Sequence, residues 1–325
     1  MAACSDSIYP RSTNSTLSLS LSLISIYLSV TMAACSVQKC REKSLIKSIS
    51  IPFYDCPYSM PTTSPAMPID ETWEQLKEEA QSDIINEPIL RNYYCDLILF
   101  RPSLESALAA HLASKLSIPD IIPRDTLEHL LHDALTADPE LGCAVRADLC
   151  AVRDRDPACE KMVHCFLYYK GFLALQVHRV AHWLWAQKGR RAAALLLQSR
   201  SSEVFAVDIH PGARIGKGIL LDHATGVVIG ETAVIGNDVS MLHGVTLGGT
   251  GKQAGDRHPK VGDGVLIGAG ANVLGNVRIG DGAKIGAGAV VLKPVPDGAT
   301  AVGSPAKVLE GKKSSLPAMS MDHRF

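Results

Sequence analysis

Apolar residues in the C-terminal third of the chain recur every six positions. Stepping by six from Ile209 gives seven apolar positions up to Val245, and stepping from Val261 gives six more up to Val291. An amphipathic helix has a period of about 3.6 residues and a half-buried strand a period of about 2, so neither explains this pattern. A hexapeptide period predicts a parallel β-helix, in which each short strand points one aliphatic side chain inward and small residues form the corners.

The six-residue period is interrupted once, between Val245 and Val261. The spacing of these two residues exceeds two whole repeats by four positions, so we expect a loop inserted at 248–259. The loop is rich in glycine and charge and contains Gly248, Gly249, Gly251, Lys252, Asp256, Arg257 and His258. Such a loop on a rigid scaffold is a common location for a functional site.

The middle of the chain, from Asp70 to about residue 200, has apolar residues at helical spacing. Ser103, Asp125 and Asp138 are expected to begin helices, Asp125 in a capping box and Asp138 directly before a proline. The stretch 166–197 is apolar on nearly all sides, which predicts burial between helices or between subunits. The predicted fold class is therefore α+β: an all-α domain at 68–203, a left-handed parallel β-helix at 204–309 and a C-terminal tail at 310–325.

The N-terminal segment 1–62 has a composition of its own. No acidic residue occurs between Ser7 and Arg41, and serine and threonine are abundant. This composition is typical of an organelle transit segment. The leucine- and serine-rich run at 17–30 is too short and too polar to span a bilayer. We expect a disordered leader at 1–62 that directs import into a plastid or mitochondrion, with a cytosolic protein as the alternative.

Charge and cysteine content narrow the classes of partner. The formal net charge is −1, so no overall basic field favours nucleic acid or a membrane surface. The nine cysteines include no C-x-x-C pair, and none lies beyond Cys165. This pattern argues against a zinc ribbon and favours a reducing compartment.

Polar residues interrupt the repeat at two places. Asp208 precedes Ile209, while Asp222 and His223 follow directly after a repeat position. If each coil consists of three hexapeptides, Asp208 stacks on Gly226 and lies on the same prism face as His223. That arrangement would permit an Asp–His contact.

The chain resembles the serine O-acetyltransferases, particularly those of plants, in six segments. Two lie in the helical part, Arg155-Asp-Pro-Ala158 and Tyr169-Lys-Gly-Phe172, and four follow in order in the C-terminal part. The four are Asp208-Ile-His-Pro211, Leu221-Asp-His-Ala-Thr225, Val245-Thr-Leu-Gly-Gly-Thr-Gly-Lys252 and Gly255-Asp-Arg-His-Pro-Lys260. The resemblance covers about residues 70–309. It implies that the protein transfers an acetyl group from acetyl-CoA to L-serine, giving O-acetyl-L-serine and CoA, which is the first step of cysteine synthesis from serine.

The resemblance also implies roles for catalytic and CoA-binding residues. His223 would be the general base that takes the proton of the serine hydroxyl, and imidazole suits this task because its pKa lies near working pH. Asp208 would hold the imidazole in the right tautomer. Backbone N–H groups near Gly249 would stabilise the oxyanion, and Ala269 and Lys284 would contact CoA.

Four further residues are implied as the serine site. Asp156 and Asp222 would bind the amino group, and Arg257 with His258 would bind the carboxylate, a suitable ligand for a guanidinium group. The resemblance further implies homotrimers paired into a hexamer and inhibition by cysteine at the serine site. Plant members carry an acidic, aromatic tail that enters the next enzyme, O-acetylserine sulfhydrylase. The printed sequence ends at Phe325 without such a tail, which argues against a stable complex with it.

Five of these residues also have a purely structural interpretation. Asp208 could cap the first coil, and His223 could be a structural histidine at a subunit seam. Arg257 and His258 could be solvated loop residues, and Asp156 could belong to a surface cluster of ion pairs.

Other functions remain open on the sequence. The scaffold could acetylate another hydroxyl acceptor, or could regulate the sulfhydrylase as a binding partner. A zinc site as in γ-class carbonic anhydrases is not expected, because the histidines of the repeat region show no ligand spacing (His210, His223, His243 and His258). His178 and His182 have i, i+4 spacing but no third ligand, so we expect them to pack helices.

Overall fold

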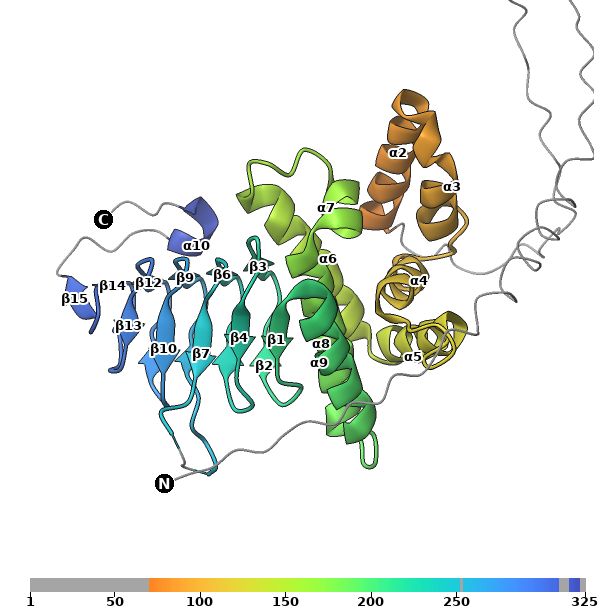
Figure 1. The fold of residues 1–325 in the computed structure, drawn as a ribbon. Coiled ribbons are helices and arrows are strands. Elements are labelled where there is room, and N and C mark those ends of the chain that lie inside the picture. The colour runs from red at the N-terminus through yellow and green to blue at the C-terminus, as the bar shows by residue number, and fades with distance from the viewer. Residues whose placement is uncertain (1–69, 252–253, 310–315, 322–325) are drawn as a thin grey trace, which may run out of the picture. The chain divides into compact units, whose positions relative to one another are not determined.

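The computed structural model describes residues 70–251, 254–309 and 316–321. These residues belong to one compact unit. The expected leader and most of the expected tail lie outside the described residues. Helices come first along the chain and short strands follow (Figure 1), which confirms the predicted α+β class. None of the described helices is long and apolar enough to cross a membrane.

The helical part contains α-helices joined by short 3₁₀ and π segments. In chain order these are α2 (Glu71–Asn86), η1 (Pro88–Leu90), α3 (Arg91–Tyr94), η2 (Cys95–Leu99), α4 (Leu104–Leu116), α5 (Arg124–Ala137), α6 (Pro139–Arg155), α7 (Met162–Tyr168), α8 (Lys170–Ala186) and α9 (Arg191–Phe205). A short α10 (Pro317–Ser320) lies near the C-terminus.

Two of the three predicted helix caps are confirmed. Ser103 accepts a hydrogen bond from the N–H of Ser106 at 3.2 Å, and Asp138 accepts one from the N–H of Glu140 at 3.0 Å. The prediction for Asp125 is wrong, because α5 begins one residue before it, after Pro123. The Asp125 carboxylate therefore lies inside the first turn, where it can still favour the positive end of the helix dipole.

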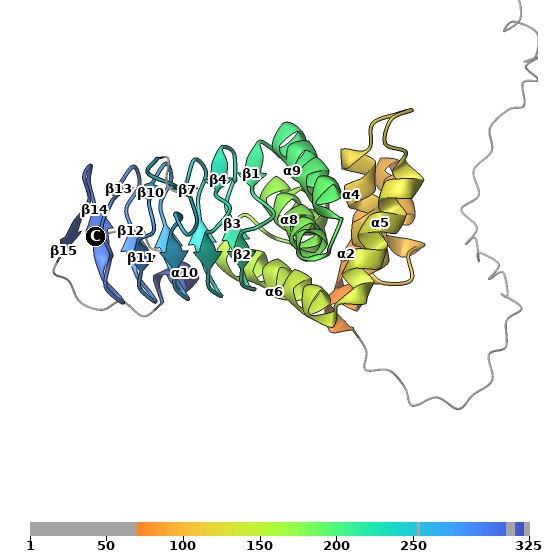
Figure 2. The same ribbon diagram turned by 90° about the horizontal axis from the view of Figure 1, so that it is seen from below.

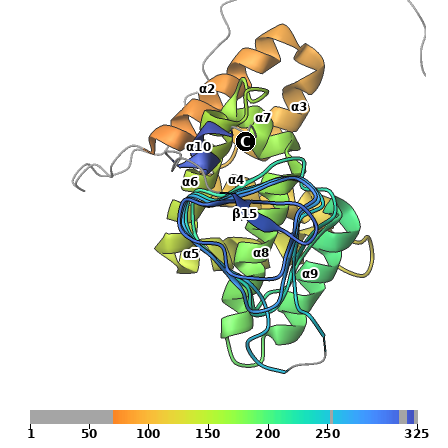
Figure 3. The same ribbon diagram turned by 90° about the vertical axis from the view of Figure 1, so that its left-hand side faces the viewer.

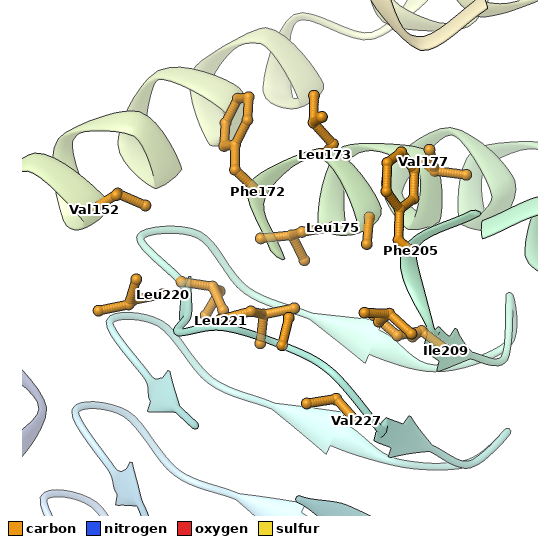
Figure 4. Close-up of a cluster of buried hydrophobic side chains, with 14 of the residues drawn as sticks. Val152, Phe172, Leu173, Leu175, Val177, Phe205, Ile209, Leu220, Leu221 and Val227 are labelled. Carbon is orange, nitrogen blue, oxygen red and sulfur yellow. The ribbon is translucent and has the colours of Figure 1, made fainter. Parts of the chain in front are cut away.

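The predicted burial of 166–197 holds for α8. Most of its side chains are buried, including Phe172 and Leu175, against α9, α5 and the strand β3 (Leu220–Leu221). The following helix differs, since Leu195 and Leu196 on α9 are 44% and 42% exposed in the single chain. Figure 4 shows how Phe172, Leu175 and Phe205 meet the side chains of the first coils.

The strands form a parallel β-helix with three sheets. One sheet contains β1 (Val207–Ile209), β4 (Val227–Ile229), β7 (Thr246–Gly248), β10 (Asn272–Leu274) and β13 (Val290–Val291). The second contains β2 (Arg214–Ile215), β5 (Val234–Ile235), β8 (Lys260–Val261) and β11 (Arg278–Ile279). The third contains β3, β6 (Ser240–Met241), β9 (Leu266–Ile267), β12 (Lys284–Ile285), β14 (Thr300–Val302) and β15 (Lys307–Leu309). Of the strands named here, only β14 and β15 pair antiparallel. Figure 3 shows the β-helix viewed along the stack of coils.

The thirteen repeat positions form the core of the β-helix, as predicted. All are buried except Ile215, which is half-buried. In the first two strands of the first sheet, however, two residues point inward rather than one: Val207 and Ile209 are both buried in β1, and Val227 and Ile229 are both buried in β4. This doubling explains an error in the predicted register.

The prediction of a single interruption between Ile209 and Val291 is wrong, because the register shifts twice within this range. The first coil, in which Val207 pairs with Val227, is two positions longer than a later coil of three hexapeptides, in which Asn272 pairs with Val290. The coil with the inserted loop, in which Thr246 pairs with Asn272, is eight positions longer than that later coil. The additions lie at 222–226 and between β7 and β8. After the first shift, a step of six residues reaches the other inward position of the strand. Because that position is also apolar, the six-residue pattern continues without a visible break.

A buried ion pair joins the helices to the first coil. Asp148 on α6 is fully buried and accepts two hydrogen bonds from Arg179 on α8, at 2.9 and 3.0 Å. The same carboxylate accepts the backbone N–H of Ile219 at 2.9 Å, and Arg179 donates to the carbonyl oxygen of Gly216 at 2.7 Å. The helices thus hold the turn between β2 and β3, at the end of the stack where α8 and α9 lie beside β1 (Figure 2).

Candidate active site

His223 lies on an enlarged corner of the first coil. This corner, 222–226, is two positions longer than the matching corner at 242–244. His223 and Ala224 adopt left-handed backbone conformations with φ of 56° and 58°. The N–H of Ala224 donates to the carbonyl oxygen of Asp222 at 2.6 Å, which tightens the turn. As a result, the side chain of His223 is 73% exposed. Non-glycine residues with a left-handed backbone conformation are often found at functional sites.

A cavity of about 560 Å³ lies between this corner and the helices. Asp156, Asp222 and His223 all line it, so three predicted site residues meet here. Oδ1 of Asp222 is 3.8 Å from Nε2 of His223. Asp156 ends α6, and its Oδ1 accepts the N–H of Ala158 at 2.9 Å.

The cavity is suited to a small cation. Among the described residues, no lysine or arginine forms an ion pair with Asp156 or Asp222. Burial raises the pKa of the nearby Tyr169 to about 12, and the charges of the two carboxylates add to this effect. The phenol is therefore neutral near pH 7 and adds no negative charge of its own to the cavity.

Gly171 and Lys170, at the start of α8, support the corner from the side of the helices. A Cβ atom on Gly171 would be 2.1 Å from the carbonyl oxygen of Leu221, so only glycine allows α8 to approach this closely. Nζ of Lys170 donates to Oγ1 of Thr225, on the same corner as His223. Both residues lie within the segment Tyr169-Lys-Gly-Phe172, which by itself assigns them no role; the glycine is the signal in the sequence for a close approach.

His243 and Ala269 follow His223 along the same corner of the stack. The N–H of Gly244 donates to the carbonyl oxygen of Thr225 at 2.8 Å, and the N–H of Gly270 donates to that of His243 at 2.9 Å. The rings of His223 and His243 pack edge to face, with centroids 5.9 Å apart. Ala269 is thus two coils from His223, along one edge. Lys284 is placed differently, on β12 in the third sheet, where it is buried.

Asp208 does not meet His223 in the single chain. It pairs with Val228 in the ladder, not with Gly226, because the first coil is two positions longer than three hexapeptides. Its Oδ1 accepts a hydrogen bond from Gln198 at 2.7 Å. No hydrogen bond or ion pair joins Asp208 to His223 within the described part of the chain, so their pairing stays a prediction.

Arg257 and His258 lie at the opposite edge of the first sheet, near the corner between β4 and β5. Arg257 forms an ion pair with Glu231 at 2.8 Å, and this contact keeps the pKa of Glu231 below its ordinary value. Nδ1 of His258 accepts the N–H of Thr232 at 3.1 Å. Gly249 lies alongside, since a Cβ atom there would be 3.7 Å from Nε2 of His258. The sequence does not point to Glu231 or Thr232, because their contacts cross between coils.

Histidine and cysteine positions do not form a metal site in the described ranges. No group of three or more metal-binding side chains comes together there. His178 is buried, which lowers its pKa well below the ordinary value, and His182 contacts the carbonyl oxygen of Pro211 through Nδ1 at 2.8 Å. These contacts pack α8 against the first coil, since the hydrogen-bond partner of His178 is Ala213 and that of His182 is Pro211.

A stack of parallel hexapeptide coils, with a histidine and a carboxylate at one corner facing a second carboxylate at the end of α6, is the arrangement of a hexapeptide-repeat transferase. Residues 258–293 match the family described as bacterial transferase hexapeptide (six repeats), and residues 72–177 match the serine acetyltransferase N-terminal family. One rice relative, probable serine acetyltransferase 4, is 70% identical over 79% of this chain and 83% of its own length. The chain belongs to the serine acetyltransferase family.

Other relatives show what family members bind and where they are found. The chloroplastic serine acetyltransferase 1 of Arabidopsis thaliana is 60% identical over 78% of this chain and 82% of its own length. A soybean serine acetyltransferase solved with serine has a TM-score of 0.72 and 59% identity, over 75% of this chain and all of that one. A Brucella abortus serine acetyltransferase solved with coenzyme A has a TM-score of 0.72 and 50% identity, over 74% and 96% of the two chains.

Proposed function

We propose that this protein is a serine O-acetyltransferase, which converts acetyl-CoA and L-serine into O-acetyl-L-serine and CoA. The observation that carries the proposal is the cavity in which Asp156 and Asp222 lie beside the exposed His223. The identity of the acyl donor and of the acceptor follows from membership of the serine acetyltransferase family. The product is the precursor of cysteine synthesis from serine.

The reaction requires one proton to be moved twice. His223 takes the proton of the serine hydroxyl as its oxygen attacks the thioester carbonyl carbon. The C–S bond of the resulting tetrahedral intermediate then breaks, and the protonated imidazole returns the proton to the leaving thiolate, which gives CoA thiol. Backbone N–H groups near Gly249 stabilise the oxyanion. Ala269, along the same edge as His223, and Lys284 contact CoA.

Serine is held at both of its charged groups. Asp156 and Asp222 bind the ammonium group, since neither carboxylate forms an ion pair with a lysine or arginine within the described ranges. Arg257 and His258 bind the carboxylate through charge-assisted hydrogen bonds. Asp208 orients the base.

One chain alone does not bring these two groups of residues together. His223 and His258 lie at opposite edges of the first sheet, separated by a strand that spans roughly 10 Å for its three residues. A second copy that places its own Arg257 edge against the His223 edge would complete the site. We therefore propose a cyclic trimer with three shared sites, paired into a hexamer.

The activity is tested by release of free thiol from acetyl-CoA. The wild-type protein is expected to release thiol faster with L-serine than with threonine, homoserine or amino sugars. His223→Ala is expected to reduce the serine-dependent rate by at least about 100-fold, because a general base contributes about 10² to 10⁴. A faster rate with another acceptor would reject serine as the substrate.

The shared site is tested by complementation. His223→Ala and Arg257→Ala chains are each expected to be inactive, yet co-refolded trimers should recover about a quarter of the wild-type activity, because random assembly leaves that share of interfaces with both native residues. Mixtures that stay inactive, although size-exclusion chromatography shows mixed trimers, would place each site within one chain.

We also propose import into a plastid or mitochondrion, supported by the composition of segment 1–62 and by the chloroplastic relative. We propose a division of the chain at 68–203, 204–309 and 310–325, which is supported by helices that precede the strands; α9 continues to Phe205, two residues past the first boundary. A fusion of segment 1–62 to a fluorescent protein tests the import, and cytosolic fluorescence would contradict it.

A further inference from the structure

Several hydrogen bonds converge on Thr232, one coil before the inserted loop. Its Oγ1 accepts the backbone N–H groups of Arg257 and His258, each at 3.1 Å. Its own N–H donates to Nδ1 of His258 at 3.1 Å, and its carbonyl oxygen accepts Nζ of Lys260 at 2.8 Å. Thr232 therefore holds both the backbone of the Arg257-His258 pair and the histidine ring.

These contacts define the protonation of the ring. Because Nδ1 of His258 accepts a backbone N–H, the proton of the neutral imidazole is on Nε2. Oγ1 of Thr232 lies 2.9 Å from the same Nδ1. His258 is only 7% exposed, and burial, followed by the neighbouring Arg257 charge, lowers its pKa. The neutral ring can therefore donate a hydrogen bond only through its Nε2–H group.

Gly230 provides the space in which the ring lies. A Cβ atom on Gly230 would be 2.1 Å from both Cδ2 and Nε2 of His258. The φ of Gly230 is not among the left-handed glycine values, so its backbone does not itself require glycine. The three atoms nearest to such a Cβ all belong to the His258 ring, so the lack of a side chain at Gly230 makes room for this histidine. Gly249 borders the same nitrogen from the loop, at an ordinary contact distance of 3.7 Å from its would-be Cβ.

We propose that Gly230 and Thr232 are positioning residues that fix His258 in one orientation and one tautomer, with its Nε2–H directed to the carboxylate of the amino-acid substrate. This inference rests on the proposed function, in which Arg257 and His258 bind the serine carboxylate. It assigns a role to the corner between β4 and β5, which carries neither the base nor the residues that bind the ammonium group.

The first test compares Thr232→Val with Thr232→Ser. Valine keeps the shape of threonine but leaves two loop N–H groups without their acceptor, while serine retains the hydroxyl. For Thr232→Val we expect KM for L-serine to rise about tenfold or more, with KM for acetyl-CoA within about twofold of wild type. The preference for L-serine over L-serinamide, which lacks the carboxylate, should fall by a similar factor. Thr232→Ser should restore both values.

The second test is a double-mutant cycle with Gly230→Ala and His258→Ala. If the added methyl group acts by displacing the ring, Gly230→Ala should lower kcat/KM for serine about tenfold or more in the wild type and change it little once His258 is alanine. An equal loss in both backgrounds would show that Gly230 acts independently of His258.

The outcomes separate the two proposals. A wild-type protein without serine-dependent thiol release rejects the proposed function. An active wild type whose Thr232→Val variant keeps the native serine KM and the native preference over serinamide overturns the positioning role. Thermal melting and size-exclusion chromatography of each variant check the fold, and the double-mutant cycle decides the question should Thr232→Val fail to assemble.

Discussion

The α-carbon of Gly171 faces the carbonyl oxygen of Leu221 so closely that a Cβ atom would lie 2.1 Å from that oxygen. Leu221 directly precedes Asp222 and His223, so this contact fixes the distance between the start of α8 and the corner that carries His223. The helical part therefore forms one wall of the cavity and does not merely precede the β-helix in the chain.

Gly171→Ala is expected to destabilise the protein and to lower activity together. The carbonyl oxygen belongs to the backbone and cannot rotate away, so we expect a loss of about 1 to 3 kcal/mol in the free energy of unfolding, measured in urea. Gly142→Ala on α6 is the matched control. Its Cβ would meet only the side-chain ends of Glu105 and Arg146, at 3.0 and 3.2 Å, and alanine favours a helix, so its stability should change by less than about 1 kcal/mol. Equal effects of the two variants would contradict the close contact.

Asp156→Asn is expected to weaken binding of serine specifically. The amide keeps an oxygen for the N–H of Ala158 but lacks the charge that attracts an ammonium group. Loss of one charge-assisted hydrogen bond predicts a rise of about tenfold or more in KM for serine, with little change in KM for acetyl-CoA. The neighbouring Asp154 is exposed and paired with Arg153, so Asp154→Asn serves as the control. An unchanged serine KM for Asp156→Asn would remove this residue from the site.

Replacing one partner of the buried Asp148–Arg179 ion pair should lower the free energy of unfolding more than replacing both partners. Asp148→Asn leaves the Arg179 charge buried without its partner, and we expect a loss of about 3 to 5 kcal/mol in the free energy of unfolding. Replacing both residues, as Asp148→Leu with Arg179→Met, should cost less than the sum of the two single changes. Additive losses in urea denaturation would show that the two side chains act independently.

The stability of the helical part should fall between about pH 6.5 and pH 4 because of His111. Burial lowers the pKa of His111 to about 4, and its Nε2 contacts the carbonyl oxygen of Leu167 at 3.0 Å. Between these pH values the unfolded chain binds a proton that the folded chain does not, so acidification favours unfolding, by at most about 3 kcal/mol for this group. His111→Gln should flatten the pH dependence of unfolding, although the buried His178 still contributes. His129→Gln, at an exposed position, should leave the pH dependence unchanged.

The sequence alone determined the local features of this protein. The six-residue period specified stacked coils because each inward position must be apolar to be buried, and twelve of the thirteen positions are buried. Ser103 and Asp138 marked helix starts because a cap depends only on residues within the same turn. The predicted helix start at Asp125 is wrong because Pro123 is the last extended residue before α5 begins.

The tertiary structure decided which residues meet. The two added positions at 222–226 were invisible in the sequence because both inward positions of the strands beside them are apolar, so a shift by two leaves the pattern intact. That shift pairs Asp208 with Val228 and leaves it beside Gln198 rather than His223. Contacts such as Thr232 with His258 cross between coils, and no local rule encodes them. Burial and charge patterns follow from neighbours in the chain, whereas the site depends on register, which the whole stack of coils determines.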